Sequence, residues 1–186
     1  MGVIIVIAVM AFVIIILISL YNRLVKLRNN RENAFADIDV QLRQRHDLIP
    51  QLVDTVKGYM KHEEKVLTAV TEARANAMKA SGIDDKIKAE NQLTAALGGL
   101  QVAVEAYPDL KASQNFMQLQ EEISDVENKL AAARRYFNSA TRELNNAVEV
   151  FPSNIVAGIF GFKREMMFDL GEERREEMEE PGKINF

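Results

Sequence analysis

The chain has 186 residues, with 23 lysines and arginines against 27 aspartates and glutamates, and it contains no cysteine. A formal net charge of −4 without a concentrated basic face argues against nucleic acid as a partner. The lack of cysteine excludes disulfides, thiolate zinc sites and a cysteine nucleophile.

The first predicted element is an apolar helix from Val3 to Leu20 that contains no charged residue. A run of about 18 residues at about 1.5 Å per residue nearly spans a hydrocarbon core of about 30 Å. Because backbone groups in lipid must be hydrogen-bonded internally, residues 1–20 are predicted to form a transmembrane anchor. The alternative is a cleavable signal peptide, but the run lacks the preceding basic residues, the shorter apolar core and the small-residue cleavage site of such peptides.

Basic residues follow the apolar run and none precedes it. They are Arg23, Lys26, Arg28 and Arg31. Since positive charges near a span favour the cytoplasmic side, we expect residues 21–186 to lie in the cytoplasm and the N-terminus outside. The sequence therefore predicts a single-pass protein of the cell (inner) membrane, with membrane lipid as one partner.

The rest of the chain is predicted to be all-α, because apolar residues recur every three or four positions without strand-like alternation. The first helix should continue the anchor to about Leu48, and Asp47 should cap a second helix that has Pro50 in its first turn. Gly82 should end that second helix.

The third predicted helix is capped by Asp84 and ends before Tyr107, and the fourth runs from Ser113 to Phe151. A short helix is expected over residues 154–160, capped by Ser153. Because short connections make successive helices antiparallel neighbours, we expect residues 21–170 to form one antiparallel four-helix bundle.

Helix lengths bring the end of the fourth helix back towards the bilayer. An apolar, aromatic segment with two trailing cations follows there, and the residues concerned are Phe151, Ile155, Val156, Ile159, Phe160, Phe162, Lys163 and Arg164. Such a segment is typical of a membrane surface. The alternatives are that it packs into the end of the bundle or contacts another subunit.

Two rows of polar residues recur at helical spacing. The first helix carries Asn33, Asp37 and Gln41, and the fourth carries Arg134, Asn138, Arg142 and Asn145. On neighbouring antiparallel helices these rows would form a buried polar network, because buried polar groups need partners. Two solvated faces are the alternative.

No motif indicates catalysis, a cofactor or a metal. His46 and His62 are the only histidines, and neither has the spacing of a metal-binding motif. His46 lies beside Asp47 at the expected helix junction, where capping or ion pairing is the more common role.

Residues 171–186 form an acidic tail with little to pack, which is typical of disorder. The tail carries the apolar residues Ile184 and Phe186, in a pattern typical of peptides that add a strand to a carboxylate-binding domain. A frayed tail is the alternative.

Several ordered stretches together resemble the LemA family of bacterial membrane proteins. They are NAFADIDVQL at residues 33–42, RHDLIPQLV at 45–53, YPDLKA at 107–112 and FPSN at 151–154. The resemblance implies a single N-terminal anchor and an antiparallel helical bundle, and it implies no catalytic residues. Family relatives linked to organelle membranes in magnetic bacteria favour a structural role by analogy. Phe137 and Leu144 stand where the family usually has tyrosine.

The sequence thus predicts a membrane-anchored, non-catalytic scaffold or interaction protein that forms homo-oligomers and contacts other membrane proteins. The alternative is an adaptor or regulator of a membrane protease or signalling protein that acts through its C-terminal tail.

Overall fold

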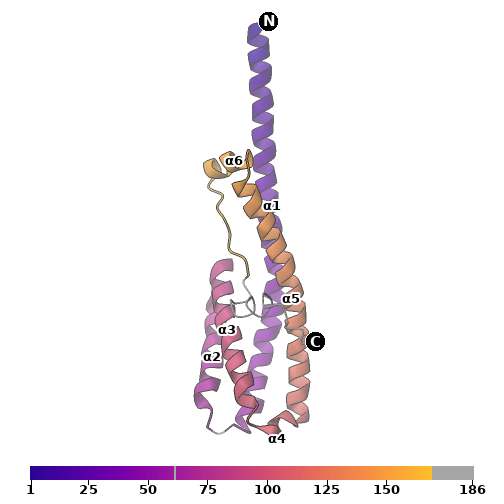
Figure 1. Ribbon diagram of the computed structural model, residues 1–186, viewed down its shortest axis with the longest axis vertical. Helices are drawn as coiled ribbons and strands as arrows, with labels where there is room; N and C mark the ends of the chain where they lie inside the picture. The colour runs from indigo at the N-terminus through magenta and orange to yellow at the C-terminus, as the bar shows by residue number, and fades with distance from the viewer. Residues whose placement is uncertain (61, 169–186) are drawn as a thin grey trace, which may run out of the picture. The chain divides into compact units, whose positions relative to one another are not determined.

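The computed structural model describes residues 1–60 and 62–168, and within them it contains helices and no strand (Figure 1). The helices are α1 (Gly2–Lys57), α2 (Glu64–Lys79), α3 (Ile83–Val104), α4 (Pro108–Lys111), α5 (Gln114–Glu149) and α6 (Ser153–Phe160). The all-α prediction is confirmed.

The chain divides into two compact units, and each takes part of α1 and part of α5. The first unit contains Met1–Ile38 and Ala132–Met167. The second unit contains Asp39–Ala131 together with Phe168, which is buried.

Helix α1 does not end near Leu48, and the prediction of a helix break at Asp47 and Pro50 is wrong. A proline inside a helix has no N–H to donate to the carbonyl four residues earlier, which here is that of His46. Arg74 of α2 supplies a substitute donor, because its Nε lies 2.7 Å from the His46 carbonyl oxygen. The helix therefore continues past Pro50 and ends at Lys57.

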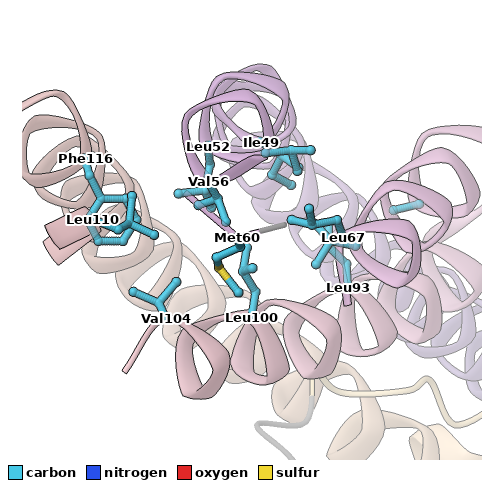
Figure 2. Packing of buried hydrophobic residues seen from close by; sticks show 13 residues of the cluster. Ile49, Leu52, Val56, Met60, Leu67, Leu93, Leu100, Val104, Leu110 and Phe116 are labelled. Carbon is cyan, nitrogen blue, oxygen red and sulfur yellow. The ribbon is translucent and has the colours of Figure 1, made fainter. Parts of the chain in front are cut away.

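An apolar core of the second unit is built from the end of α1, from α2 to α4, and from the start of α5. Figure 2 shows its members around Met60, which lies between α1 and α2. The labelled members are Ile49, Leu52, Val56, Met60, Leu67, Leu93, Leu100, Val104, Leu110 and Phe116. These positions follow the helical spacing of the sequence, so periodicity correctly identified the buried faces.

The connections differ from the prediction in detail. Helix α2 ends at Lys79, before Gly82, and Gly82 instead precedes α3 with a φ of 84°, which favours glycine. Pro108 is the first residue of the four-residue helix α4, which was not predicted from the sequence. Helix α5 starts directly after Ser113, as expected.

In the first unit, the C-terminal part of α5 runs antiparallel to α1, and α6 lies beside α1 (Figure 1). Phe35 of α1 and Phe137 of α5 meet with ring centroids 5.5 Å apart. Nearer to the N-terminus of α1, Leu24 packs with Ala147 of α5 and with Val156 and Ala157 of α6. The short helix α6 therefore closes this end of the first unit.

Candidate membrane-interface site

The first part of α1 is long and apolar enough to cross a bilayer. Its large apolar side chains from Val3 to Ile18 are exposed, and in the first unit no other element packs along this stretch (Figure 1). Packing begins at Leu20 and Tyr21, which contact the cluster around Leu24. The apolar run and the packed part of α1 therefore meet at Tyr21.

Tyr21 of α1 contacts the end of α6 and the turn that follows it. Its ring centroid lies 4.6 Å from that of Phe160 and 6.1 Å from that of Phe162. Rings at these separations contribute attraction beyond their buried area. The contacts fix α6 at the level where the exposed apolar run of α1 ends.

Helix α6 has a buried side and an exposed apolar side. Val156 and Ala157 are each 1% exposed. The exposed apolar face consists of Phe151, Ile155, Ile159 and Phe160, which are 75%, 53%, 71% and 59% exposed. The structure thus places part of the 151–164 segment in the core and leaves four large apolar side chains uncovered within the described chain.

The turn after α6 directs Phe162 back towards α1. Gly161 has a φ of 73°, and the Phe162 N–H donates to the carbonyl of Ala157 over 2.9 Å. This is the hydrogen bond of a helix that ends in a left-handed glycine. At the other end of α6, the Ser153 hydroxyl donates to the Val150 carbonyl over 2.9 Å. The prediction that Ser153 caps the N-terminus of this helix is therefore wrong.

Cations lie beside these aromatic rings. The Arg28 guanidinium carbon stands 5.5 Å from the centroid of the Phe162 ring. Lys163 is exposed, and the exposed Arg164 pairs with Glu149 at 2.9 Å. The site therefore combines exposed aliphatic and aromatic side chains with positive charge.

The segment after α6 is held on the first unit by hydrogen bonds. The Asn145 side chain donates to the Glu165 carbonyl over 2.9 Å and accepts the Glu165 N–H over 2.8 Å. The buried Arg31 pairs with the Glu165 carboxylate at 3.1 Å and donates to the Met166 carbonyl over 3.1 Å. The sequence placed Arg31 only in the basic flank and did not predict its pairing with Glu165, since no spacing rule links a helix to an irregular segment.

Comparison with known proteins identifies the chain's relatives. The model of the LemA family matches residues 34–186. The chain belongs to the LemA family. A member from Metamycoplasma hominis, Protein LemA, is 31% identical over 140 residues, which cover 73% of this chain and 63% of that protein. The alignment therefore spans less than two thirds of that relative's length.

Two further relatives of this LemA-family chain are magnetosome proteins. Magnetosome protein MamQ of Magnetospirillum gryphiswaldense is 23% identical over 185 residues, covering 86% of this chain and 68% of that protein. Magnetosome protein MamQ 2 of Paramagnetospirillum magneticum is 23% identical over 189 residues, covering 88% and 69%. None of these names denotes an enzyme, and together with the apolar helix the family marks the chain as membrane-associated.

The predicted polar network is corrected at three positions, because Asn33, Asp37 and Arg142 are exposed. On α1 the neighbouring Ala34 and Phe35 face the core, which turns Asn33 outward. The other members have different surroundings: Arg134 and Asn145 are buried, while Asn138 and Gln41 are half-buried. Asn145 bonds to the backbone of Glu165 rather than to the row on α1.

The second unit contains a buried ionic cluster around Glu90, whose side chain is 2% exposed. One carboxylate oxygen lies 2.6 Å from His46 Nε2 and the other lies 3.2 Å from Arg45 Nη1. Arg45 also pairs with Glu127 at 2.7 Å. His46 is thus hydrogen-bonded to Glu90 inside the continuous helix α1, and the expected helix junction beside Asp47 does not exist.

An open cavity of about 390 Å³ adjoins this cluster, with Asp39 and Lys86 among its lining residues. Burial alone would raise the pKa of Asp39, but hydrogen bonds from Lys86 and Arg43 outweigh burial and lower that pKa below its ordinary value. Within residues 1–60 and 62–168, no three acidic, histidine or cysteine side chains are grouped to hold a metal ion.

The predicted disordered tail, with Ile184 and Phe186, lies outside the described residues.

Proposed function

We propose that this protein is a non-catalytic membrane scaffold that is anchored by α1, rests on the bilayer surface through α6, and associates with further copies of itself and with other membrane proteins. The observation that supports it best is the contact of Tyr21 with Phe160, at 4.6 Å between ring centroids. This contact puts the exposed apolar face of α6 beside the end of the apolar run.

The length of the apolar run supports a position of α6 at the bilayer surface. The run from Val3 to Leu20 covers about 27 Å as a helix, so Tyr21 falls at the boundary between hydrocarbon and headgroups. Tyrosine is enriched at this boundary. Ile159 and Phe160 would each gain up to about 1.5–3 kcal/mol if removed fully from water, which opposes their exposure to solvent.

The orientation follows from the charges next to the span. Arg23, Lys26 and Arg28 all lie within two helical turns of Tyr21, on the side that carries the packed units. Such an excess favours the cytoplasmic face, so the chain from Tyr21 onwards lies in the cytoplasm at the inner membrane.

The scaffold role is supported by the family relatives and by the anchor. Magnetosome proteins are among the relatives, and their names connect them with an organelle rather than with a reaction. An anchor confines all copies to two dimensions, which raises their local concentration and favours association.

Energy transfer between labelled copies tests self-association. The chain has no cysteine, so Ser139→Cys provides one exposed labelling position on α5. Full-length protein with donor or acceptor dyes is mixed in proteoliposomes, and we expect transfer above the level for randomly distributed molecules as lipid is added. Transfer at the random level would overturn the scaffold proposal.

A matched variant tests whether the exposed apolar face of α6 contacts lipid or another subunit. Ile155→Asn with Ile159→Asn removes two exposed side chains from the apolar face of α6. Because we propose that this face contacts lipid, energy transfer between Ser139→Cys labels should stay unchanged. Loss of transfer would identify the face as a subunit contact instead.

A further inference from the structure

The geometry points to a binding site for the phosphate of an anionic phospholipid, formed by Arg28 of α1 and Lys163 after α6. This inference rests on the proposed position of α6 on the bilayer, and it names the lipid chemistry that this surface selects. The site is the charged border of the exposed apolar face formed by Phe151, Ile155, Ile159 and Phe160.

Arg28 lies next to an aromatic ring, which restrains its guanidinium beside α6. It stands 5.5 Å from the centroid of Phe162, and Tyr21 meets the same ring edge-on at 6.1 Å. The contact with the ring involves no hydrogen bond, so it consumes none of the five N–H donors of the guanidinium. A guanidinium can give two parallel hydrogen bonds to phosphate oxygens.

The acidic residues near Arg28 leave its charge largely available. Glu32 is the nearest carboxylate, 3.9 Å from Nε, and the two side chains are 50% and 57% exposed. A long ion pair between exposed side chains is weak. Lys163, the residue after Phe162, is exposed and has no carboxylate partner in the part of the chain that the structure describes.

Charge is concentrated at this end of the first unit. Residues 21–32 and 149–165 contain six lysines and arginines but three glutamates, although the whole chain carries −4. Three of the six cations, Arg28, Arg31 and Arg164, pair with Glu32, Glu165 and Glu149, and the pair of Arg28 is the longest at 3.9 Å. Cations therefore exceed glutamates by three in these segments, which adjoin the end of the apolar run of α1.

The direction of the side chains brings Arg28 towards the bilayer. Side chains on a helix lean towards its N-terminus, which for α1 is the membrane side. Arg28 follows Tyr21 by seven residues, or about 10 Å along the helix, and its contact with Phe162 places the guanidinium beside the ring that Tyr21 also touches. This is the level of lipid headgroups.

A membrane lipid, rather than free phosphate, fits the whole surface. Two exposed apolar side chains, Ile159 and Phe160, precede Lys163 by four and three residues. Acyl chains cover such side chains while the headgroup phosphate meets Arg28 and Lys163, whereas a free anion would leave the apolar side chains in water.

Electron paramagnetic resonance of spin-labelled lipids tests the inference on the full-length protein. The protein is reconstituted in phosphatidylcholine bilayers with trace spin-labelled phosphatidylglycerol or spin-labelled phosphatidylcholine. The immobilised fraction of each probe measures its association with the protein. We expect the wild type to prefer the phosphatidylglycerol probe, and the preference should fall about five-fold for each of Arg28→Gln and Lys163→Gln.

A matched control separates local from general charge effects. Arg135→Gln removes one exposed cation from α5, 14 residues before Glu149, or about 21 Å along the helix. The neighbouring Tyr136 bonds to Asn30 of α1, two residues from Arg28, so Arg135→Gln should lower the preference less than Lys163→Gln does. Equal probe association in the wild type, or an equal effect of Arg135→Gln and Lys163→Gln, would overturn the inference. Lys163→Gln alone is sufficient, since this exposed side chain contributes little to folding.

Two further measurements show whether a negative result concerns the lipid site or the position of α6 on the bilayer. Competition by millimolar inorganic phosphate would assign the site to a free anion and overturn the lipid assignment. A fluorophore at Ile159→Cys, quenched by nitroxide lipids in phosphatidylcholine alone, reports whether α6 reaches the bilayer at all. Quenching without lipid preference overturns only this inference, whereas loss of quenching overturns the proposed function.

Discussion

Arg74→Met will destabilise the second unit by removing the donor that replaces the missing N–H of Pro50. Arg74 Nε donates to the His46 carbonyl over 2.7 Å from a partly buried position. A hydrogen bond from a charged donor contributes about 1.5–3 kcal/mol, and partial exposure places this one near the lower limit. Methionine keeps much of the aliphatic length, so the change reports mainly on the hydrogen bond.

Thermal unfolding of the detergent-solubilised full chain, followed by circular dichroism at 222 nm, measures the effect. A loss of about 1.5 kcal/mol corresponds to a fall in Tm of about 3–6 °C in a chain of this size. Every variant is compared in the same detergent and at the same protein concentration.

A double-mutant cycle with Pro50→Ala isolates the proposed cause. Alanine restores an N–H that donates to the His46 carbonyl, so Arg74 is no longer needed as its donor. In the Pro50→Ala background we expect Arg74→Met to cost less than about 0.5 kcal/mol, as for a surface substitution. An equal cost in both backgrounds would refute the explanation of the continuous helix.

Three further predictions concern other contacts. Glu90→Ala removes the buried ion-pair partner of Arg45 and the hydrogen-bond partner of His46 and should cost about 3–5 kcal/mol by the same unfolding assay, whereas Glu127→Ala, at a 36% exposed side chain, should cost at most about 1 kcal/mol; equal costs would contradict the assigned burial. The lowered pKa of Asp39 stabilises the fold above the ordinary aspartate pKa of about 3.9 and loses this effect as the pH falls through the lowered pKa. The Tm difference between wild type and Asp39→Asn should therefore shrink between pH 7 and pH 2, and a constant difference would exclude the ionised carboxylate as its source. Gly161→Ala should cost about 1–2 kcal/mol because φ is 73°, while Gly158→Ala, inside α6 with open space around it, should stabilise by up to about 1 kcal/mol; a loss at both would indicate steric crowding instead.

Local periodicity accounts for most of the helical architecture that the sequence predicted. The buried positions of the second unit, such as Leu52, Leu67 and Leu100, lie on the apolar stripes of their helices. The predicted helix break at Pro50 was wrong because the compensating donor, Arg74, lies 28 residues downstream. A local rule for proline contains no information about such a distant side chain.

The candidate site was predictable in position but not in detail. Helix lengths correctly returned the chain to the end of the apolar run, as the contact between Tyr21 and Phe160 shows. The spacing of polar residues did not reveal which row faces inward, and Asn33 is exposed. The partner of Asn145 is the backbone of Glu165, in a segment without regular structure. A hydrogen bond to backbone does not depend on the partner's residue type, so it cannot be predicted from residue spacing.

The central claim is that α6 lies on the bilayer, and depth-dependent fluorescence quenching tests it most directly. An environment-sensitive dye is attached to Ile159→Cys or, as a control, to Ser139→Cys on α5 in the full-length protein. The proteoliposomes contain lipids with a nitroxide near the headgroup. We predict blue-shifted emission and strong quenching at position 159, with water-like emission and weak quenching at position 139. Water-like, unquenched emission at both positions would contradict it.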